Sequence, residues 1–235
     1  MRISVIVPTY NEGGTIGKCL EALRNQTFND YEIVVVDGHS RDNTVEVAKK
    51  YADRILFDEG KGAAAARNLA VRAVDSEIVA FVDGDTTVPK NWVETVDRAF
   101  KKGFVGVGGP LLPDGGGFLD KLIFFACADL VRRISSAFGS HQFSGANCAY
   151  SREAYLKVGG FREGLGMLDD VDLSMRIKNF GKEKFEPKLY AATSIRRSIQ
   201  KGHLKTVKEY LQGYLSLLSR GQVQNYDYLR EIKKD

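Results

Sequence analysis

The sequence predicts an α/β fold: a doubly wound, mostly parallel central sheet flanked by helices, with further helices at the C-terminus. Short apolar runs alternate with segments of helical spacing over the first hundred residues, and polar sequences follow the apolar runs. The chain has 235 residues, of which 43% are hydrophobic, enough for one sizeable core. Because no low-complexity linker divides it, we expect a single domain over residues 1–235.

Four strands are expected first, at 3–7, 32–36, 54–57 and 78–82, because each is a short apolar run. Helices are expected between them at 15–25, 44–51 and 63–74, from apolar spacing, capping residues and alanine content. Beyond residue 100 we expect a strand at 104–107, a Gly/Pro-rich bend at 108–117 and a helix from 118 to about 138. One valine and four leucines at three- and four-residue intervals predict an amphipathic helix at 204–218.

Composition excludes several classes of protein. The net charge is +4, and basic residues are interspersed with acidic ones, which argues against a nucleic-acid partner. The longest apolar run, 122–128, is far short of the roughly 20 residues that cross a bilayer. The three cysteines lack the spacing of a zinc site or redox couple, so we expect buried thiols in a reducing, cytoplasmic compartment. No signal peptide is recognisable, and we expect the mature chain to begin near Met1.

The most informative motif is the acidic hook Asp83-Gly84-Asp85, which directly follows the apolar run 78–82. The end of a buried strand lies at the rim of a sheet, where open α/β folds bind ligands. Two carboxylates one residue apart repel each other unless a cation neutralises them. A hard divalent cation prefers such oxygens and keeps sites free for phosphate. An ordinary turn is the alternative interpretation.

Polar residues at the ends of the first two strands form a second candidate group: Pro8, Thr9, Tyr10, Glu12 and Asp37. These ends would be adjacent in a parallel sheet, and could form a wall for a nucleobase or ribose. The alternative for Asp37 is a turn aspartate. Arg67 lies on a helix of small residues and could contact phosphate or base, or simply be a surface residue of a packed helix.

A second acidic cluster comprises Asp169, Asp170 and Asp172, followed by Arg176. Aspartates favour helix starts, but three in four positions exceed what capping requires and indicate a catalytic base. The segment 144–147, Ser-Gly-Ala-Asn, could supply backbone and amide donors to a sugar.

Together these motifs resemble glycosyltransferase family 2, inverting enzymes with the GT-A fold. The matching segments follow the family's order: VIVPTYNE at 5–12, VVVDGHSRDNT at 34–44, KGAAAARN at 61–68, FVDGD at 81–85, GAN at 145–147, GGFRE at 159–163 and LDDVDLSMR at 168–176. The resemblance covers about residues 3–180. It implies a nucleoside-diphosphate-sugar donor and a divalent cation, Mn²⁺ or Mg²⁺.

The resemblance also implies roles for individual residues. The nucleotide sugar would be bound by Pro8, Thr9, Tyr10, Glu12, Asp37, Arg67, Asp83 and Gly84. Asp85 would ligate the metal as part of a DxD motif, and Asp170 would be the general base. The acceptor side would comprise Gly145, Ala146, Asn147, Asp169, Asp172 and Arg176.

Two positions depart from the family pattern. Asp169 stands where the family often has Glu, and the segment 193–197, Thr-Ser-Ile-Arg-Arg, stands where many members have a metal-binding His. Metal ligation would then rest on Asp85 and the diphosphate, with Arg196 or Arg197 helping to neutralise phosphate charge.

The expected function is therefore inverting, metal-dependent transfer of a sugar to a hydroxyl acceptor, lipid-linked or a glycan, in polysaccharide or glycolipid biosynthesis. One alternative is a nucleotidyltransferase acting on sugar phosphates, which would carry a Gly-rich basic loop where this chain has PTYNE. Another is a non-catalytic sugar-nucleotide-binding protein, which would lack the hook or Asp170.

Within the single domain we expect a nucleotide-sugar half at 1–109, an acceptor and base half at 110–200, and a helical extension at 201–235. The apolar helix from Phe118 and the C-terminal amphipathic helix predict peripheral contact with the inner face of a membrane. Ordinary core packing or a homodimer contact is the alternative.

Overall fold

The computed structural model of the chain describes residues 1–137, 143–165, 168–202, 205, 209, 212 and 213. Its seven-stranded central sheet has the order β3-β2-β1-β4-β8-β6-β9, and a smaller sheet has the order β5-β10-β7. The strands of the central sheet are β1 (Ile3–Thr9), β2 (Tyr31–Asp37), β3 (Arg54–Phe57), β4 (Ile78–Val82), β6 (Gly106–Gly108), β8 (Asn147–Ser151) and β9 (Glu183–Phe185). Those of the small sheet are β5 (Thr86–Thr87), β7 (Leu111–Asp114) and β10 (Ala191–Ser194).

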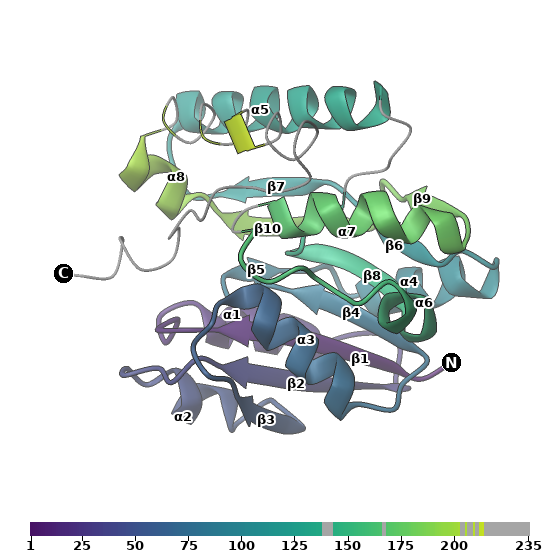
Figure 1. Cartoon of the computed structure of the whole chain (residues 1–235). Coiled ribbons are helices and arrows are strands. Elements are labelled where there is room, and N and C mark those ends of the chain that lie inside the picture. Colours follow the sequence, from purple (N-terminus) through teal and green to yellow (C-terminus); the bar gives the residue numbers. More distant parts are fainter. Residues whose placement is uncertain (138–142, 166–167, 203–204, 206–208, 210–211, 214–235) are drawn as a thin grey trace.

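Helices cover both faces of the central sheet (Figure 1). They are α1 (Ile16–Arg24), α2 (Thr44–Ala48), α3 (Ala63–Ala73), α4 (Trp92–Lys101), α5 (Phe118–Ala137), α6 (Arg152–Lys157), α7 (Asp169–Ile177) and α8 (Arg196–Lys201), with a 3₁₀ turn at Lys178–Phe180. Helix α5 lies beyond the small sheet, at the end of the molecule opposite β3 (Figure 1). Within the described residues, no helix is long and apolar enough to cross a membrane.

Alternating side chains of the buried strands fill two separate cores. Val5 and Val7 of β1 point into the core closed by α1 and α4, whereas Ile6 points into the core closed by α3 and α7. Strand β1 runs parallel to both β2 and β4. All three strands are buried on both faces, as their continuous apolar sequences predict. Cys19 and Cys148 are buried free thiols, as predicted, whereas Cys127 is partly exposed.

The predicted Gly/Pro-rich bend at 108–117 is wrong in part, because its middle forms strand β7. This strand pairs in parallel with β10, from Leu111 opposite Ala191 to Asp114 opposite Ser194. Strand β7 lies at the edge of the small sheet and pairs with one strand only, so Pro113, which lacks a backbone N–H, is tolerated there. The strand expected at 104–107 is displaced by about one to two residues, to 106–108. The amphipathic helix expected at 204–218 lies mostly outside the described residues.

Candidate active site

The candidate site lies at β1, where the order of strands in the central sheet reverses. Strand β1 has β2 on one side and β4 on the other, and all three run parallel, so their carboxyl ends share one edge. Thr9 is paired with Asp37 at that edge, and the acidic hook follows β4 directly. A crevice outside such a switch point is the common ligand site of open α/β sheets.

Asp37 organises the loops that follow β1 and β2. Its side chain is fully buried, and its two carboxylate oxygens accept hydrogen bonds from the Ser40 amide (2.8 Å) and hydroxyl (2.6 Å). The same hydroxyl accepts a bond from the backbone N–H of Asn11 (2.7 Å), and the side-chain oxygen of Asn11 accepts one from the backbone N–H of Arg41 (2.8 Å). Ser40 and Asn11 were missed as site residues; a hydroxyl three residues after a strand-end aspartate is the turn signal that could have found Ser40.

The remaining residues expected to bind the nucleotide surround the end of β1. Pro8 is buried in the strand, and Tyr10 is exposed at the rim. Thr9 is buried, and its hydroxyl has no hydrogen-bond partner among the described residues. A Cβ atom added to Gly84 would lie 3.3 Å from that hydroxyl, so the hook packs tightly against β1.

Arg67 joins the two acidic motifs that the sequence singles out. Arg67 is only 4% exposed, and its guanidinium lies 2.6 Å from the Asp83 carboxylate and 3.5 Å from that of Asp169. It also stands over the Phe161 ring, 5.2 Å from the centroid. A Cβ atom at Gly145 would come within 3.0 Å of the guanidinium, so a glycine leaves the space that Arg67 occupies. The hook and the second acidic cluster therefore belong to one site.

Glu12 and two arginines form the other side of the hook. Glu12 is 4% exposed and accepts bonds from Nη2 of Arg197 (2.9 Å) and Nη2 of Arg196 (3.2 Å). The Thr15 hydroxyl donates a third bond to the same carboxylate (2.9 Å). Both arginines begin α8, about 185 residues from Glu12 in sequence, so the C-terminal part of the domain completes the site.

Asp85 has the properties of a cation ligand. Burial and the charge of Asp83 raise its pKa to about 6, while Arg197 opposes that shift. Its carboxylate makes no hydrogen bond or ion pair with any described residue. No three His, Cys, Asp or Glu side chains converge as a metal cluster in the described part of the chain. The hard oxygens of Asp85 fit Mn²⁺ or Mg²⁺ only if a bound ligand supplies further oxygens.

Asp169 and Asp170 open helix α7, as predicted. The Asp170 carboxylate accepts bonds from the amides of Gly145 (3.2 Å) and Val171 (2.7 Å), and Asp169 accepts one from the Asp170 amide (2.9 Å). Burial, reinforced by the neighbouring Asp169 charge, raises the pKa of Asp170 to about 7. Burial likewise raises the pKa of Asp169 to about 6, against the opposing charge of Arg67. Asp170 is thus held in place with a pKa near neutrality, which suits a general base.

Asp172 and Arg176 lie in the same helix but hold the loop before it. Asp172 is buried and pairs with Arg162 (3.0 Å) and with Nε of Arg176 (2.7 Å). Arg176 also donates to the carbonyls of Val158 and Gly160, at 2.7 Å each. These bonds tie both side chains to the 158–162 loop, and their expected acceptor-side role stays a prediction.

Asn147 and Ala146 are also built into the framework. The Asn147 side chain is fully buried; its oxygen accepts from Trp92 Nε1 (2.8 Å), and its amide nitrogen donates to Pro110 (3.2 Å) and Leu189 (2.7 Å). Both amide hydrogens are therefore engaged within the protein. Ala146 is buried beside it. Of the tetrapeptide 144–147, only the Gly145 amide bonds to the acidic cluster among the hydrogen bonds of the described residues.

Asn68 is a positioning residue that the sequence motif contained but did not identify. Its side chain donates to the Phe161 carbonyl (2.8 Å) and accepts from the Phe161 amide (3.0 Å) and the Tyr155 hydroxyl (2.6 Å). It therefore fixes the ring on which Arg67 lies. Gly160, at φ 69°, completes this packing, because a Cβ atom there would fall 2.5 Å from the Asn68 oxygen.

The sequence is similar to that of known glycosyltransferases. The family model described as Glycosyl transferase family 2 matches residues 4–159. Glycosyltransferase AglE of Haloferax volcanii is 34% identical over 145 residues, which cover 57% of this chain and 48% of AglE. The matched part thus spans about half of that relative, and smaller shares of other curated relatives.

Solved structures share the fold. The mannosyltransferase PcManGT from Pyrobaculum calidifontis, in complex with GDP-Man and Mn²⁺, superimposes with a TM-score of 0.74 at 21% identity, over 94% of this chain and 65% of that one. Residues 1–349 of TarS from S. aureus, in complex with UDP-GlcNAc, give a TM-score of 0.66 at 22% identity, over 83% of this chain and 58% of that one. At these identities the likeness establishes the architecture.

Proposed function

Because the chain belongs to glycosyl transferase family 2, we propose that it is an inverting, metal-dependent glycosyltransferase acting on a nucleoside-diphosphate sugar and a hydroxyl acceptor. Its architecture is the GT-A fold, as the resemblance implied. The observation that carries the proposal is Arg67, which holds the hook and the acidic pair in one site. A donor bound at the hook would lie beside Asp170.

In this mechanism Asp170 takes the proton of the acceptor hydroxyl while the acceptor oxygen attacks the anomeric carbon. The bond from that carbon to the diphosphate breaks in the same step, so the configuration inverts and the nucleoside diphosphate leaves with the electron pair. The Gly145 and Val171 amides hold the carboxylate of Asp170 in place. Its raised pKa makes it a stronger base than an exposed aspartate once it is ionised.

The donor side follows from the strand ends. We assign the nucleoside to the wall formed by Pro8, Thr9, Tyr10 and Asp37, with Asp83 and Gly84 next to the ribose. Asp85 would hold the divalent cation, which when bound neutralises charge on the leaving diphosphate. The complexes of PcManGT with GDP-Man and Mn²⁺, and of TarS with UDP-GlcNAc, support this class of donor and cofactor.

Family membership favours sugar transfer over the two alternatives. A nucleotidyltransferase would need a basic, glycine-rich loop after the first strand, and β1 is followed by Tyr10, Asn11 and Glu12. A protein that only binds sugar nucleotides has no use for a base at the second acidic cluster, yet Asp170 is held there with a pKa near neutrality. Sugar transfer is consistent with both features.

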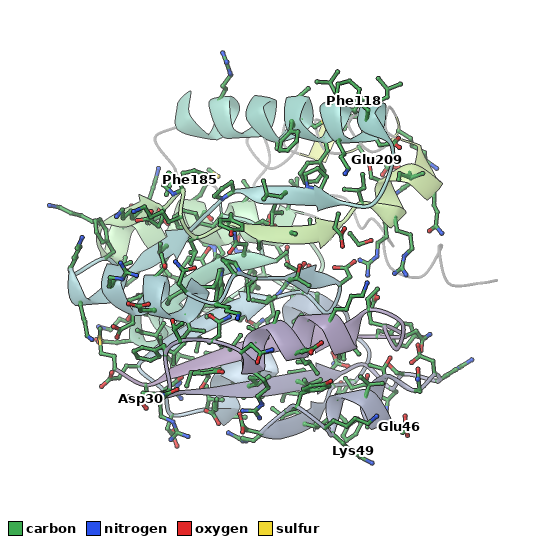
Figure 2. The ribbon with its side chains drawn as sticks, turned by 180° about the vertical axis from the view of Figure 1, so that it is seen from behind. Asp30, Glu46, Lys49, Phe118, Phe185 and Glu209 are labelled. Atoms are coloured by element: carbon green, nitrogen blue, oxygen red, sulfur yellow. The ribbon has the colours of Figure 1, made fainter. Side chains whose placement is uncertain are left out.

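The exposed face of α5 favours a lipid-linked acceptor over a free glycan. Phe118, Leu119, Leu122 and Phe125 are exposed by 85, 66, 54 and 48%, so these side chains are not core residues. They lie within two turns of one helix, with Lys121 exposed among them. Figure 2 shows Phe118 at the end of the molecule opposite Asp30, Glu46 and Lys49. An apolar stripe with a basic residue suits the interface of an anionic membrane.

This stripe starts close to the donor site. Strand β7 leads into α5, and the Ile195 amide, at the start of α8, donates to the Asp114 carbonyl at the end of β7 (3.2 Å). A Cβ atom at Gly116 would meet the Ile195 side chain at 2.8 Å. Arg196 and Arg197 follow immediately. A membrane docked on α5 would therefore bring a lipid-linked hydroxyl towards the site that holds the leaving diphosphate.

Vesicle flotation tests the membrane contact. The wild type should float with vesicles containing anionic lipid, and the variant Leu122→Ser/Phe125→Ser should not. Phe57→Ser, a change of an exposed apolar residue on β3, serves as a control that should still float. A wild type that stays at the bottom of the gradient would refute the membrane surface. Dimers in solution that dissociate in the Leu122→Ser/Phe125→Ser variant would instead assign the stripe to a homodimer.

Substitution of Asp170 tests the function itself. Asp170→Asn should bind nucleoside diphosphate within about threefold of the wild type but lower turnover by about 10² to 10⁴, the usual contribution of a general base. Asp75→Asn, at an exposed position, is the matched control and should change neither quantity. A screen of nucleoside-diphosphate sugars with Mn²⁺ would supply the donor. Full turnover by Asp170→Asn would remove Asp170 from the mechanism.

A further inference from the structure

The start of helix α8 is fixed to the acidic hook by the small sheet. Strand β5 follows Asp85 directly, and β10 pairs with it so that Thr193 lies opposite Thr86. The two threonine hydroxyls are 3.0 Å apart, and the Ser194 amide donates to the Asp85 carbonyl (3.3 Å). The chain then enters α8 with Arg196 and Arg197. Their backbone is thereby held beside Asp85, at the end of the site where a donor diphosphate would lie.

The two arginines share one hydrogen-bonded partner. Both bond to Glu12, which is 4% exposed, and the charge of Arg197 also acts on the hook carboxylates Asp83 and Asp85 without a hydrogen bond to either in the described part of the chain. Among the described residues, each guanidinium uses only Nη2 in hydrogen bonds, which leaves its other N–H donors available. The Arg196 and Arg197 side chains are 48% and 32% exposed, so a ligand can reach them.

We propose that Arg196 and Arg197 form a diphosphate clamp that Glu12 holds in place before the donor binds. Glu12 keeps two like charges close together, and the donor's diphosphate oxygens then accept hydrogen bonds from the remaining guanidinium donors. The clamp carries part of the charge of the leaving group, at the position where the sequence has two arginines rather than a metal-binding histidine. This inference rests on the proposed function, because it takes the ligand to be a nucleoside diphosphate.

A purely structural role for the arginines predicts something different. If they served only to neutralise Glu12, their removal would lower stability and leave the distinction between mono- and diphosphates unchanged. A clamp instead acts on the second phosphate. The affinity for a diphosphate relative to the corresponding monophosphate is therefore the readout that separates the two roles, and it needs no catalysis.

Titration calorimetry with UDP, GDP, UMP and GMP, each in EDTA and in Mn²⁺, tests the clamp on the full chain. Arg196→Gln/Arg197→Gln should lose about 10- to 100-fold in affinity for the diphosphate in EDTA, and no more than about threefold for the monophosphate. The loss should be smaller in Mn²⁺, because the cation then shares the charge. Arg98→Gln, an exposed arginine on α4, is the matched control and should bind like the wild type.

Two further variants keep the test decisive if the double variant does not fold. Arg197→Lys retains the charge but not the planar set of donors, and should lose part of the diphosphate preference. Glu12→Gln removes the charge that holds the two guanidinium groups together, so the preference for diphosphate over monophosphate in EDTA should fall. Equal diphosphate preference in the wild type and the arginine variants, or an unchanged preference in Glu12→Gln, would overturn the clamp. A wild type that binds neither diphosphate, even in Mn²⁺, would instead overturn the proposed function.

Discussion

Arg67 provides the sharpest test of how the site is held together. Replacing it by methionine keeps most of the apolar stem but removes the charge between Asp83 and Asp169. Removing one partner of a buried ion pair typically costs 3 to 5 kcal/mol, because the other charge remains buried. Asp83 is 37% exposed, so water compensates part of its loss, whereas Asp169 is 10% exposed. We therefore expect the free energy of unfolding to fall by about 3 kcal/mol.

The loss should depend on pH, with a defined sign. Without the guanidinium, the pKa of Asp169 should rise further above its present value of about 6, which is itself above the ordinary value. Asp169 then accepts a proton in the folded variant on acidification, and protonation removes the uncompensated charge. The difference in stability between wild type and Arg67→Met should accordingly shrink from about pH 7.5 to about pH 5.

Urea unfolding of both proteins at the two pH values measures this difference. Arg98→Met is the matched control, because Arg98 pairs with Glu94 on the exposed face of α4, where such a pair is worth about 0.5 kcal/mol or less. If Arg67→Met lost no more stability than Arg98→Met, or if its loss stayed constant with pH, the assignment of Arg67 as the bridge between the two acidic motifs would be refuted.

Two further predictions concern the acidic cluster. The kcat/KM of the wild type should rise with pH through about 7 and then level off, because Asp170, whose pKa burial raises to about 7, accepts a proton only when ionised; a rate that is flat from pH 5 to 8 would contradict this assignment. Asp172→Asn should lower the free energy of unfolding by about 2 kcal/mol, through loss of its bonds to Arg162 and Arg176, and change nucleoside-diphosphate affinity by less than about twofold. Unchanged stability on urea unfolding, with lost binding in calorimetry, would give Asp172 a direct role in the site.

The parts of the fold that could be predicted from the sequence are those in which one segment carries the whole signal. Strands β1, β2 and β4 are continuous apolar runs because both faces of each are buried, and the polar residues after them mark the ligand edge. The small sheet carries no such signal. Its strands are two to four residues long, and β5 pairs with β10 across more than 100 residues. Only tertiary contact makes them strands.

The candidate site also contains residues that the sequence indicates and partners that it does not. The carboxylates could be predicted because turns and strand ends do not need so many of them. Their partners could not, because each partner comes from a distant segment: Glu12 bonds to Arg197, and Asn68 bonds to Phe161. The segment 144–147 could supply donors to a sugar, yet the side-chain amide of Asn147 makes three hydrogen bonds inside the protein. Local sequence identifies which groups are polar, and packing decides which of them remain available to a ligand.

The proposed reaction is a single displacement at the anomeric carbon, with Asp170 taking the acceptor's proton. The most direct test is the configuration of the first product formed from an α-linked nucleoside-diphosphate sugar, read by proton NMR from the anomeric coupling of the new glycosidic bond. The mechanism predicts a β linkage, because the acceptor attacks from the side opposite the leaving diphosphate. An α linkage in the first product would contradict the single displacement and the role of Asp170 in it.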